Sequence, residues 1–113
     1  ALRFYLLHAI PTGRDGEFTL EQLVEHCNTH LANDLGNLAS RTLTMVHKYF
    51  AGSAAHGWEP EGLRDPAARE ALRALMNAAE QAYVEVPMRF RDIEIHEALA
   101  LALQPVVRAS EFI

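Results

Sequence analysis

The chain has little of what membrane proteins and disulfide-rich domains require. It contains one cysteine, Cys27, and its ten basic side chains are outnumbered by fifteen acidic ones, for a net charge of −5. A single cysteine cannot form an internal disulfide, which favours a reducing compartment. No apolar run approaches the ~20 residues that span a bilayer, and an acidic chain is poorly suited to sequence-blind binding of phosphate backbones. We therefore expect a cytoplasmic chain with no membrane partner.

Signatures of catalysis are absent as well. The sequence has no glycine-rich phosphate loop, no nucleophile elbow and no pair of carboxylates at helical spacing beside an apolar pocket. We therefore expect no catalytic residue and no cofactor in this chain.

Apolar residues make up 50% of the chain, and they recur at the spacing of helices rather than strands. Ala1–Ile10 reads as a buried helix that stops before Pro11. After a polar turn, Thr19 and Gln22 fit a capping box, and one long amphipathic helix follows as far as about Phe50. The residues of this helix expected to face inward are Leu20, Leu23, Val24, Cys27, Leu31, Leu35, Leu38, Met45, Val46 and Tyr49.

The pattern of apolar residues in the second half of the sequence predicts two more helices, which follow a loop over Gly52–Asp65. The aspartate at the end of this loop precedes Pro66 and suits an N-cap. Pro87 should end that helix, Asp92 should cap the last one, and Pro105 should kink it near Leu101. Their expected inward residues are Leu72, Leu75, Met76, Ala79, Tyr83, Val86, Ile95, Leu99, Ala102, Val106 and Phe112. The fold class is therefore all-α, an antiparallel bundle of three to four helices with one long central helix.

The nearest approach to a metal site is the pair His26 and His30. Because they are four residues apart on one helix, both imidazoles could reach the same ion. No further ligand pattern accompanies them in the sequence, and Cys27 falls on the apolar stripe. We therefore expect ordinary histidines and no metal at this place.

The centre of the long helix carries an unusual cluster. Its sequence, LANDLGNLASR from residue 31 to 41, contains four mediocre or poor helix formers. At helical spacing a polar ridge forms from Asn33, Asn37, Arg41 and Lys48. Asparagine and arginine are well shaped to contact base edges. A solvated helix face, with Gly36 allowing a neighbouring helix to pack closely, is the alternative.

The same motif resembles methionyl-tRNA synthetases, in the region where the catalytic core meets the anticodon-binding bundle. Ala1-Leu2-Arg3 matches the end of the DALR element of class I synthetases, and LANDLGNLASR is similar to the methionine enzymes specifically. RFRDIEIHEALALAL and RASEFI resemble the last helix of that bundle less distinctively. The resemblance implies an anticodon-binding domain over residues 1–113, truncated at both ends, with residues 1–18 forming the junction with the catalytic core.

In that family the asparagine and arginine of an NLxxR pattern contact bases of the CAU anticodon. The resemblance therefore implies that Asn37 and Arg41 bind the anticodon, with Asn33 and Lys48 as a supporting ridge. The family's third determinant, a tryptophan in an Ala-Pro-Trp motif, would lie beyond Ile113, and Trp58 does not correspond to it.

The resemblance also implies partners for a larger enzyme. The parent would be a methionine-tRNA ligase that uses ATP with Mg²⁺, and this chain would bind methionine tRNA beside the catalytic domain. Lys48, Arg89 and Arg91 could attract phosphates. Two alternatives stay open: a helical protein-interaction module, and the anticodon domain of another class I synthetase.

Overall fold

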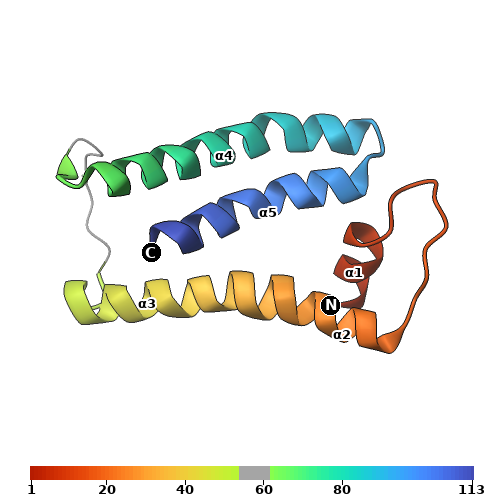
Figure 1. Ribbon diagram of the computed structural model, residues 1–113, viewed down its shortest axis with the longest axis horizontal. Helices are drawn as coiled ribbons and strands as arrows, with labels where there is room; N and C mark the ends of the chain where they lie inside the picture. Colours follow the sequence, from red (N-terminus) through yellow and green to blue (C-terminus); the bar gives the residue numbers. More distant parts are fainter. Residues whose placement is uncertain (54–61) are drawn as a thin grey trace.

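The protein is described here by a computed structural model, which covers residues 1–53 and 62–113 (Figure 1). Within those ranges it is all-helical and contains no strand, as predicted. The elements are α1 (Leu2–His8), α2 (Leu20–Cys27), the π-helix η1 (Asn28–Gly36), α3 (Asn37–Phe50), α4 (Pro66–Arg91) and α5 (Ile95–Phe112). Most of the predicted loop, including Trp58, lies outside the described residues.

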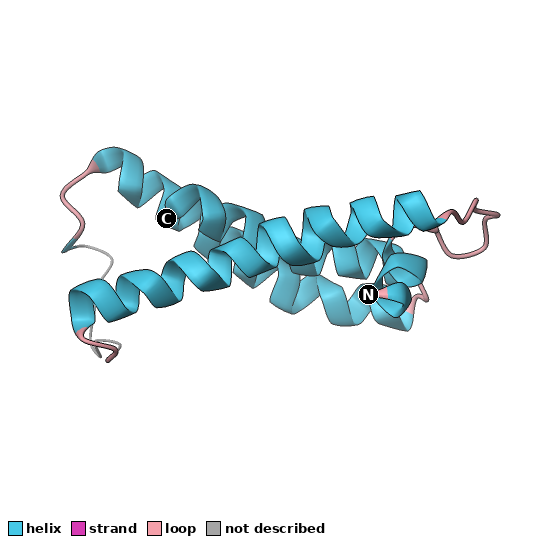
Figure 2. Ribbon diagram, turned by 90° about the horizontal axis from the view of Figure 1, so that it is seen from below, coloured by secondary structure: helices cyan, strands magenta, loops and turns pink. Residues whose placement is uncertain are grey.

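The helices form a layered bundle. α2, η1 and α3 join into the single long helix that the sequence predicts, and α5 lies between this helix and α4 (Figure 1). α4 and α5 run antiparallel, and the long helix crosses the pair at an angle (Figure 2). The short α1 packs against α5 and α2. No helix in the described parts of the chain is both long enough and apolar enough to cross a bilayer.

Side-chain caps begin two of the helices as predicted. The backbone N–H of Gln22 donates to Thr19 Oγ1 at 3.1 Å, and the N–H of Ala67 donates to Asp65 Oδ1 at 3.0 Å. Each bond satisfies one of the N–H groups that a helix leaves without a partner at its start. The side chain of Gln22 does not complete a capping box, because its Oε1 accepts from the Tyr5 hydroxyl at 3.1 Å instead.

The boundary between the last two helices differs from the prediction. α4 does not end at Pro87 but continues to Arg91. The carbonyl that loses its partner belongs to Tyr83, which is 84% exposed, so it can bond to water and the helix survives. Asp92 is the C-cap of α4 rather than the N-cap of α5, and α5 begins after Glu94 without a side-chain cap.

The turn between α4 and α5 caps the C-terminus of α4 with backbone hydrogen bonds. Ile93 adopts a left-handed conformation with φ of 63°. Its N–H donates to Phe90 O at 3.2 Å, while the N–H of Glu94 donates to Arg89 O at 2.9 Å. These are the two bonds of a Schellman motif, which stops a helix through its own carbonyls. α5 then continues through Pro105 without interruption; the bend near Leu101 stays a prediction.

The middle of the long helix is a π-helix rather than an α-helix. η1 coincides with the cluster of poor helix formers, and its i→i+5 pattern widens the turn. A Cβ added to Gly36 would lie 3.2 Å from the carbonyl oxygen of Leu31, five residues earlier, and would meet no atom of another helix within 4 Å among residues 1–53 and 62–113. The alternative role of Gly36, close packing of a neighbouring helix, is therefore wrong. Gly36 instead leaves room for the wide turn.

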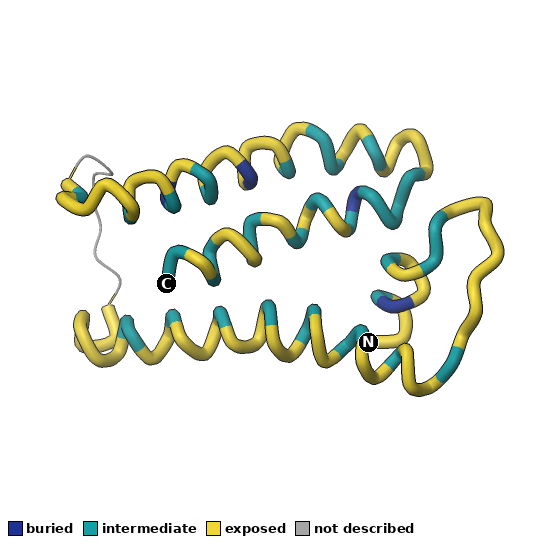
Figure 3. The backbone as a smooth tube through the Cα atoms, in the orientation of Figure 1, coloured by how far each residue is buried: buried dark blue, intermediate teal, exposed yellow. Residues whose placement is uncertain are grey.

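Burial is concentrated where the helices face each other. Figure 3 shows that the long helix is half-buried on the side toward α5 and exposed on the other. The buried apolar residues in the described ranges are Tyr5, Leu72, Ala78 and Ala98. Part of the predicted core is wrong, because it is exposed: Leu20, Val24, Leu35, Tyr49, Met76, Ala79, Tyr83 and Ala102. In the long helix one cause is η1, since its wider turn shifts the apolar stripe away from a period of 3.6.

Candidate functional site

The predicted polar ridge lies on the exposed side of the long helix. Asn37 is the first residue of α3 and Arg41 lies one turn later, so both side chains share one face. Both residues are exposed. Within residues 1–53 and 62–113 neither side chain forms a hydrogen bond or an ion pair with the rest of the chain. Their donors and acceptors are therefore available to a ligand.

The two supporting residues are also exposed. Asn33 lies in η1, one turn before Asn37. Because the turn of a π-helix is wider, Asn33 does not follow the regular angular spacing of the residues in α3. Lys48 lies near the end of α3, and its Nζ is 5.1 Å from the centre of the Tyr49 ring. Tyr49 is 65% exposed. The end of the ridge therefore offers a cation next to an accessible aromatic ring.

Arg89 is not a free cation, because its guanidinium is paired with two carboxylates of the same chain. Its Nη1 donates to Glu94 Oε2 and to Glu97 Oε2, each at 2.6 Å. The hydrogen bond to Glu94 and the charge of Glu97 raise the pKa of the Arg89 guanidinium. The suggestion that Arg89 attracts phosphates is therefore wrong. Its charge is matched by two carboxylates that hold the α4–α5 turn.

A second group of polar side chains gathers around α1. His8, at the end of α1, reaches His26 of α2 and His30 of η1, and one ligand nitrogen from each lies within 4.8 Å of the others. His8 Nδ1 and His26 Nε2 are 2.9 Å apart. The ring of Phe4 stacks on His8 with 5.1 Å between the centroids. No local pattern in the sequence indicated His8 as a member of this group, because only the packing of α1 brings it to the long helix.

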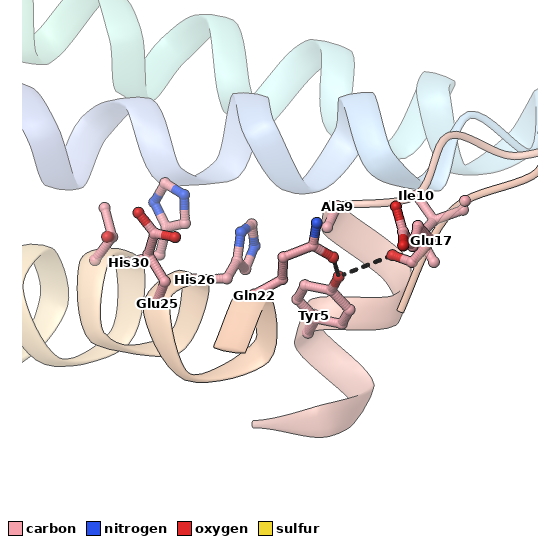
Figure 4. A pocket seen from close by; sticks show the side chains of 10 residues that line it. Tyr5, Ala9, Ile10, Glu17, Gln22, Glu25, His26 and His30 are labelled. Carbon is pink, nitrogen blue, oxygen red and sulfur yellow. Dashed lines mark hydrogen bonds between the residues drawn. The ribbon is translucent and has the colours of Figure 1, made fainter. Parts of the chain in front are cut away.

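The histidine cluster adjoins a cavity of about 410 Å³ (Figure 4). His26, His30 and Glu25 line it, and Tyr5 lines it from α1. The Tyr5 hydroxyl donates toward Gln22 Oε1 and the carbonyl oxygen of Glu17, at 3.1 and 3.3 Å. These bonds fix α1 against the start of α2. The cavity wall is therefore shared by α1 and the long helix.

The environment of His8 and His26 favours neutral imidazoles. Burial lowers the pKa of His8 below its ordinary value of 6.5, and the neighbouring His26, His30 and His96 lower it further. Burial and His30 likewise lower the pKa of His26. His30 differs in having a carboxylate partner, because its Nδ1 lies 3.2 Å from Asp34 Oδ2.

Comparison with known proteins connects this chain to a family. The profile of a family described as tRNA synthetases class I (M) matches residues 1–43, a range that includes Asn33, Asn37 and Arg41. The methionine–tRNA ligase of Bacillus subtilis (strain 168) is 38% identical over 112 residues, which is 99% of this chain and 16% of the relative. This chain is similar over nearly its whole length to one segment of the methionine–tRNA ligases.

Other methionine–tRNA ligases show the same relation. The enzyme of Clostridium perfringens is 39% identical over 114 residues, which is 100% of this chain and 16% of that enzyme. The methionine–tRNA ligase 1 of Bacillus cereus is 60% identical over 52 residues, or 46% of this chain and 8% of the relative. The chain thus spans about 16% of the length of the first two of these ligases.

Proposed function

We propose that this chain is the anticodon-binding domain of a methionine–tRNA ligase, with Asn37 and Arg41 contacting bases of the CAU anticodon of methionine tRNA. Asn33 and Lys48 extend the same ridge. The parent enzyme joins methionine to its tRNA with ATP and Mg²⁺ in the cytoplasm, using a catalytic domain that residues 1–18 adjoin. This chain contributes selection of the tRNA and no catalytic residue.

The exposure of Asn37 and Arg41 on one face of α3 is the observation that supports this proposal. Anticodon bases are unpaired, so their Watson–Crick edges can accept contacts from side chains. An asparagine amide offers two donors and an acceptor, and a guanidinium offers five donors in a plane that can also stack on a base. A regular helix holds the two groups at a fixed separation, which suits the reading of particular bases.

The charge of the chain is consistent with base reading rather than phosphate binding. With a net charge of −5, and with Arg89 paired to Glu94 and Glu97, the domain has little attraction for a phosphate backbone. Binding that depends on few phosphate contacts weakens only slightly as salt rises. Most of the attraction to tRNA would then come from other parts of the parent enzyme.

A crosslinking experiment tests the proposal on the parent enzyme. A photoreactive amino acid is placed at position 41 of α3, and a matched one at the exposed position 73 of α4. With methionine tRNA bound, we expect crosslinks from position 41 to anticodon nucleotides and none from position 73. Crosslinks from position 41 only to protein would overturn the proposal in favour of an interaction module. Selective crosslinking to a different tRNA from a mixture would assign the chain to another synthetase.

A further inference from the structure

The histidine cluster beside α1 has the composition of a transition-metal site. Three imidazoles from two separate helices converge, with their ligand nitrogens within 4.8 Å of one another. Imidazole nitrogens suit Zn²⁺, which binds three histidines together with a water molecule in some sites. We propose that His8, His26 and His30 form a zinc site that joins α1 to the long helix.

The distances require only side-chain adjustment. Tetrahedral zinc with ordinary Zn–N bonds places its ligand nitrogens about 3.4 Å apart. His8 Nδ1 and His26 Nε2, now 2.9 Å apart, would separate slightly to accept the ion, while His30 would move closer. His26 and His30 are four residues apart across the α2–η1 boundary, with ring centroids at 4.6 Å. The backbone therefore already holds all three rings near one point.

His30 has the outer partner that zinc-bound histidines usually have. Its Nδ1 lies 3.2 Å from Asp34 Oδ2, which leaves Nε2 as the nitrogen available to the metal. A carboxylate in this position fixes the tautomer and orientation of the ring and increases its basicity. Asp34 is thus a positioning residue in this site rather than a ligand.

The surroundings of the three histidines provide partial burial and space for a fourth ligand. The three histidines are half-buried, and the adjoining cavity of about 410 Å³ has room for a water as the fourth ligand. Neutral imidazole is the form that binds a metal. The sequence suggested no metal because it showed only the local pair of His26 and His30; α1 supplies the third ligand.

Calorimetric titration of the untagged 113-residue chain with zinc, after removal of metal by a chelator, tests the site. We expect one zinc per chain with a Kd below about 1 µM. His8→Gln should weaken zinc binding about 100-fold or more. This loss exceeds the 10–100-fold that is typical when a group hydrogen-bonded to a metal ligand is removed. His47→Gln, which removes an exposed histidine of α3, is the matched control and should leave the affinity unchanged.

Two outcomes would overturn the site. Absence of submicromolar binding would mean that the three rings form only a hydrogen-bonded aromatic cluster. An affinity that His8→Gln leaves unchanged would mean that zinc binds elsewhere or to the His26–His30 pair alone. Circular dichroism establishes whether each variant is folded.

A second variant covers the case in which His8→Gln fails to fold. Asp34→Asn keeps all three ligands and should weaken zinc binding by about 10–100-fold. Cobalt(II) provides a spectroscopic readout that does not depend on calorimetry, because a tetrahedral site gives visible absorption bands that are far more intense than those of the octahedral aqueous ion. We expect those bands with the unaltered chain and competition by zinc. An unaltered affinity in Asp34→Asn, or absence of the cobalt bands, would contradict the proposal.

Discussion

Arg41 lies four residues after Asn37 on α3, and both residues are exposed to solvent. Asn37 directly follows the π-helical segment that ends at Gly36. The pair therefore begins where the helix returns to regular α geometry. This geometry gives the pair a fixed separation, and its exposure means that changing either side chain should affect binding more than folding.

Asn37→Ala separates these two effects. Because the side chain is exposed and makes no hydrogen bond within the described chain, the free energy of unfolding should change by no more than about 0.5 kcal/mol. Loss of a base contact should weaken binding of methionine tRNA to the parent enzyme by about 1–3 kcal/mol. Urea unfolding and a tRNA-binding titration measure the two quantities. A large loss of stability with no specific loss of binding would assign Asn37 to the fold.

Gly36→Ala tests the wide turn of η1. In an ordinary helix this change stabilises by roughly 1 kcal/mol. Here the new Cβ would lie 3.2 Å from the carbonyl oxygen of Leu31, and a backbone oxygen inside a helix has little freedom to move. We therefore expect the free energy of unfolding to fall by about 1 kcal/mol, because crowding outweighs propensity.

Ser40→Ala is the control for this measurement. Ser40 is exposed in the regular part of α3, so alanine should stabilise it by a few tenths of a kcal/mol, about 0.5 at most. Denaturant unfolding of both variants gives the comparison. Stabilisation by Gly36→Ala equal to that of an ordinary helical glycine would mean that η1 is not a wide turn in solution.

The pH dependence of stability follows from the histidine cluster. Burial and the charges of His26, His30 and His96 lower the pKa of His8. Between that lowered value and 6.5 the unfolded chain binds a proton that the folded chain does not, so acidification favours unfolding. The stability of the metal-free chain should therefore fall as the pH drops below 6.5, and the loss should level off below the folded pKa.

Urea unfolding in chelator between about pH 7.5 and pH 5.5, a range above the ordinary pKa values of carboxyl groups, measures this slope. His8→Gln should make it shallower, whereas His47→Gln should not. A slope that is the same in all three chains would show that the cluster does not resist protonation.

Ile93→Gly should stabilise the chain. A β-branched residue with a φ of 63° is strained, and glycine adopts this conformation without cost. Ile93 is 63% exposed, so little apolar burial is lost. We expect the free energy of unfolding to rise by about 1 kcal/mol. Ile93→Ala, which shortens the side chain but keeps the Cβ, should give no such gain; equal effects of the two variants would show that strain is not the cause.

Local signals in the sequence predicted most of the fold. Thr19 and Asp65 cap helices as expected because an N-cap depends only on the next few residues. The prediction that Pro87 ends its helix was wrong. The cost of a proline in a helix depends on whether the freed carbonyl can reach water, and a local sequence pattern does not show that exposure. The predicted burial of Leu35 was wrong because a regular helical period was applied across η1. The predicted burial of Tyr83 was wrong because the bundle leaves much of α4 exposed.

The two sites differ in how far the sequence could predict them. Asn37 and Arg41 are close in sequence, so helical spacing alone placed them on one face. His8 is 18 residues from His26, and only the tertiary contact of α1 with the long helix brings them together. Likewise, the pairing of Arg89 with Glu94 and Glu97 depends on the α4–α5 turn, which no local pattern specified.

The most direct test of anticodon recognition is the kcat/KM of the parent enzyme for methionine tRNA after Arg41→Ala, with Arg73→Ala as the control. Arg73 is an exposed arginine on α4, so its removal changes the net charge equally. The account predicts that Arg41→Ala lowers kcat/KM by about 5- to 150-fold, corresponding to about 1–3 kcal/mol, and that Arg73→Ala leaves it nearly unchanged. Normal aminoacylation by Arg41→Ala, or equal losses in the two variants, would contradict it.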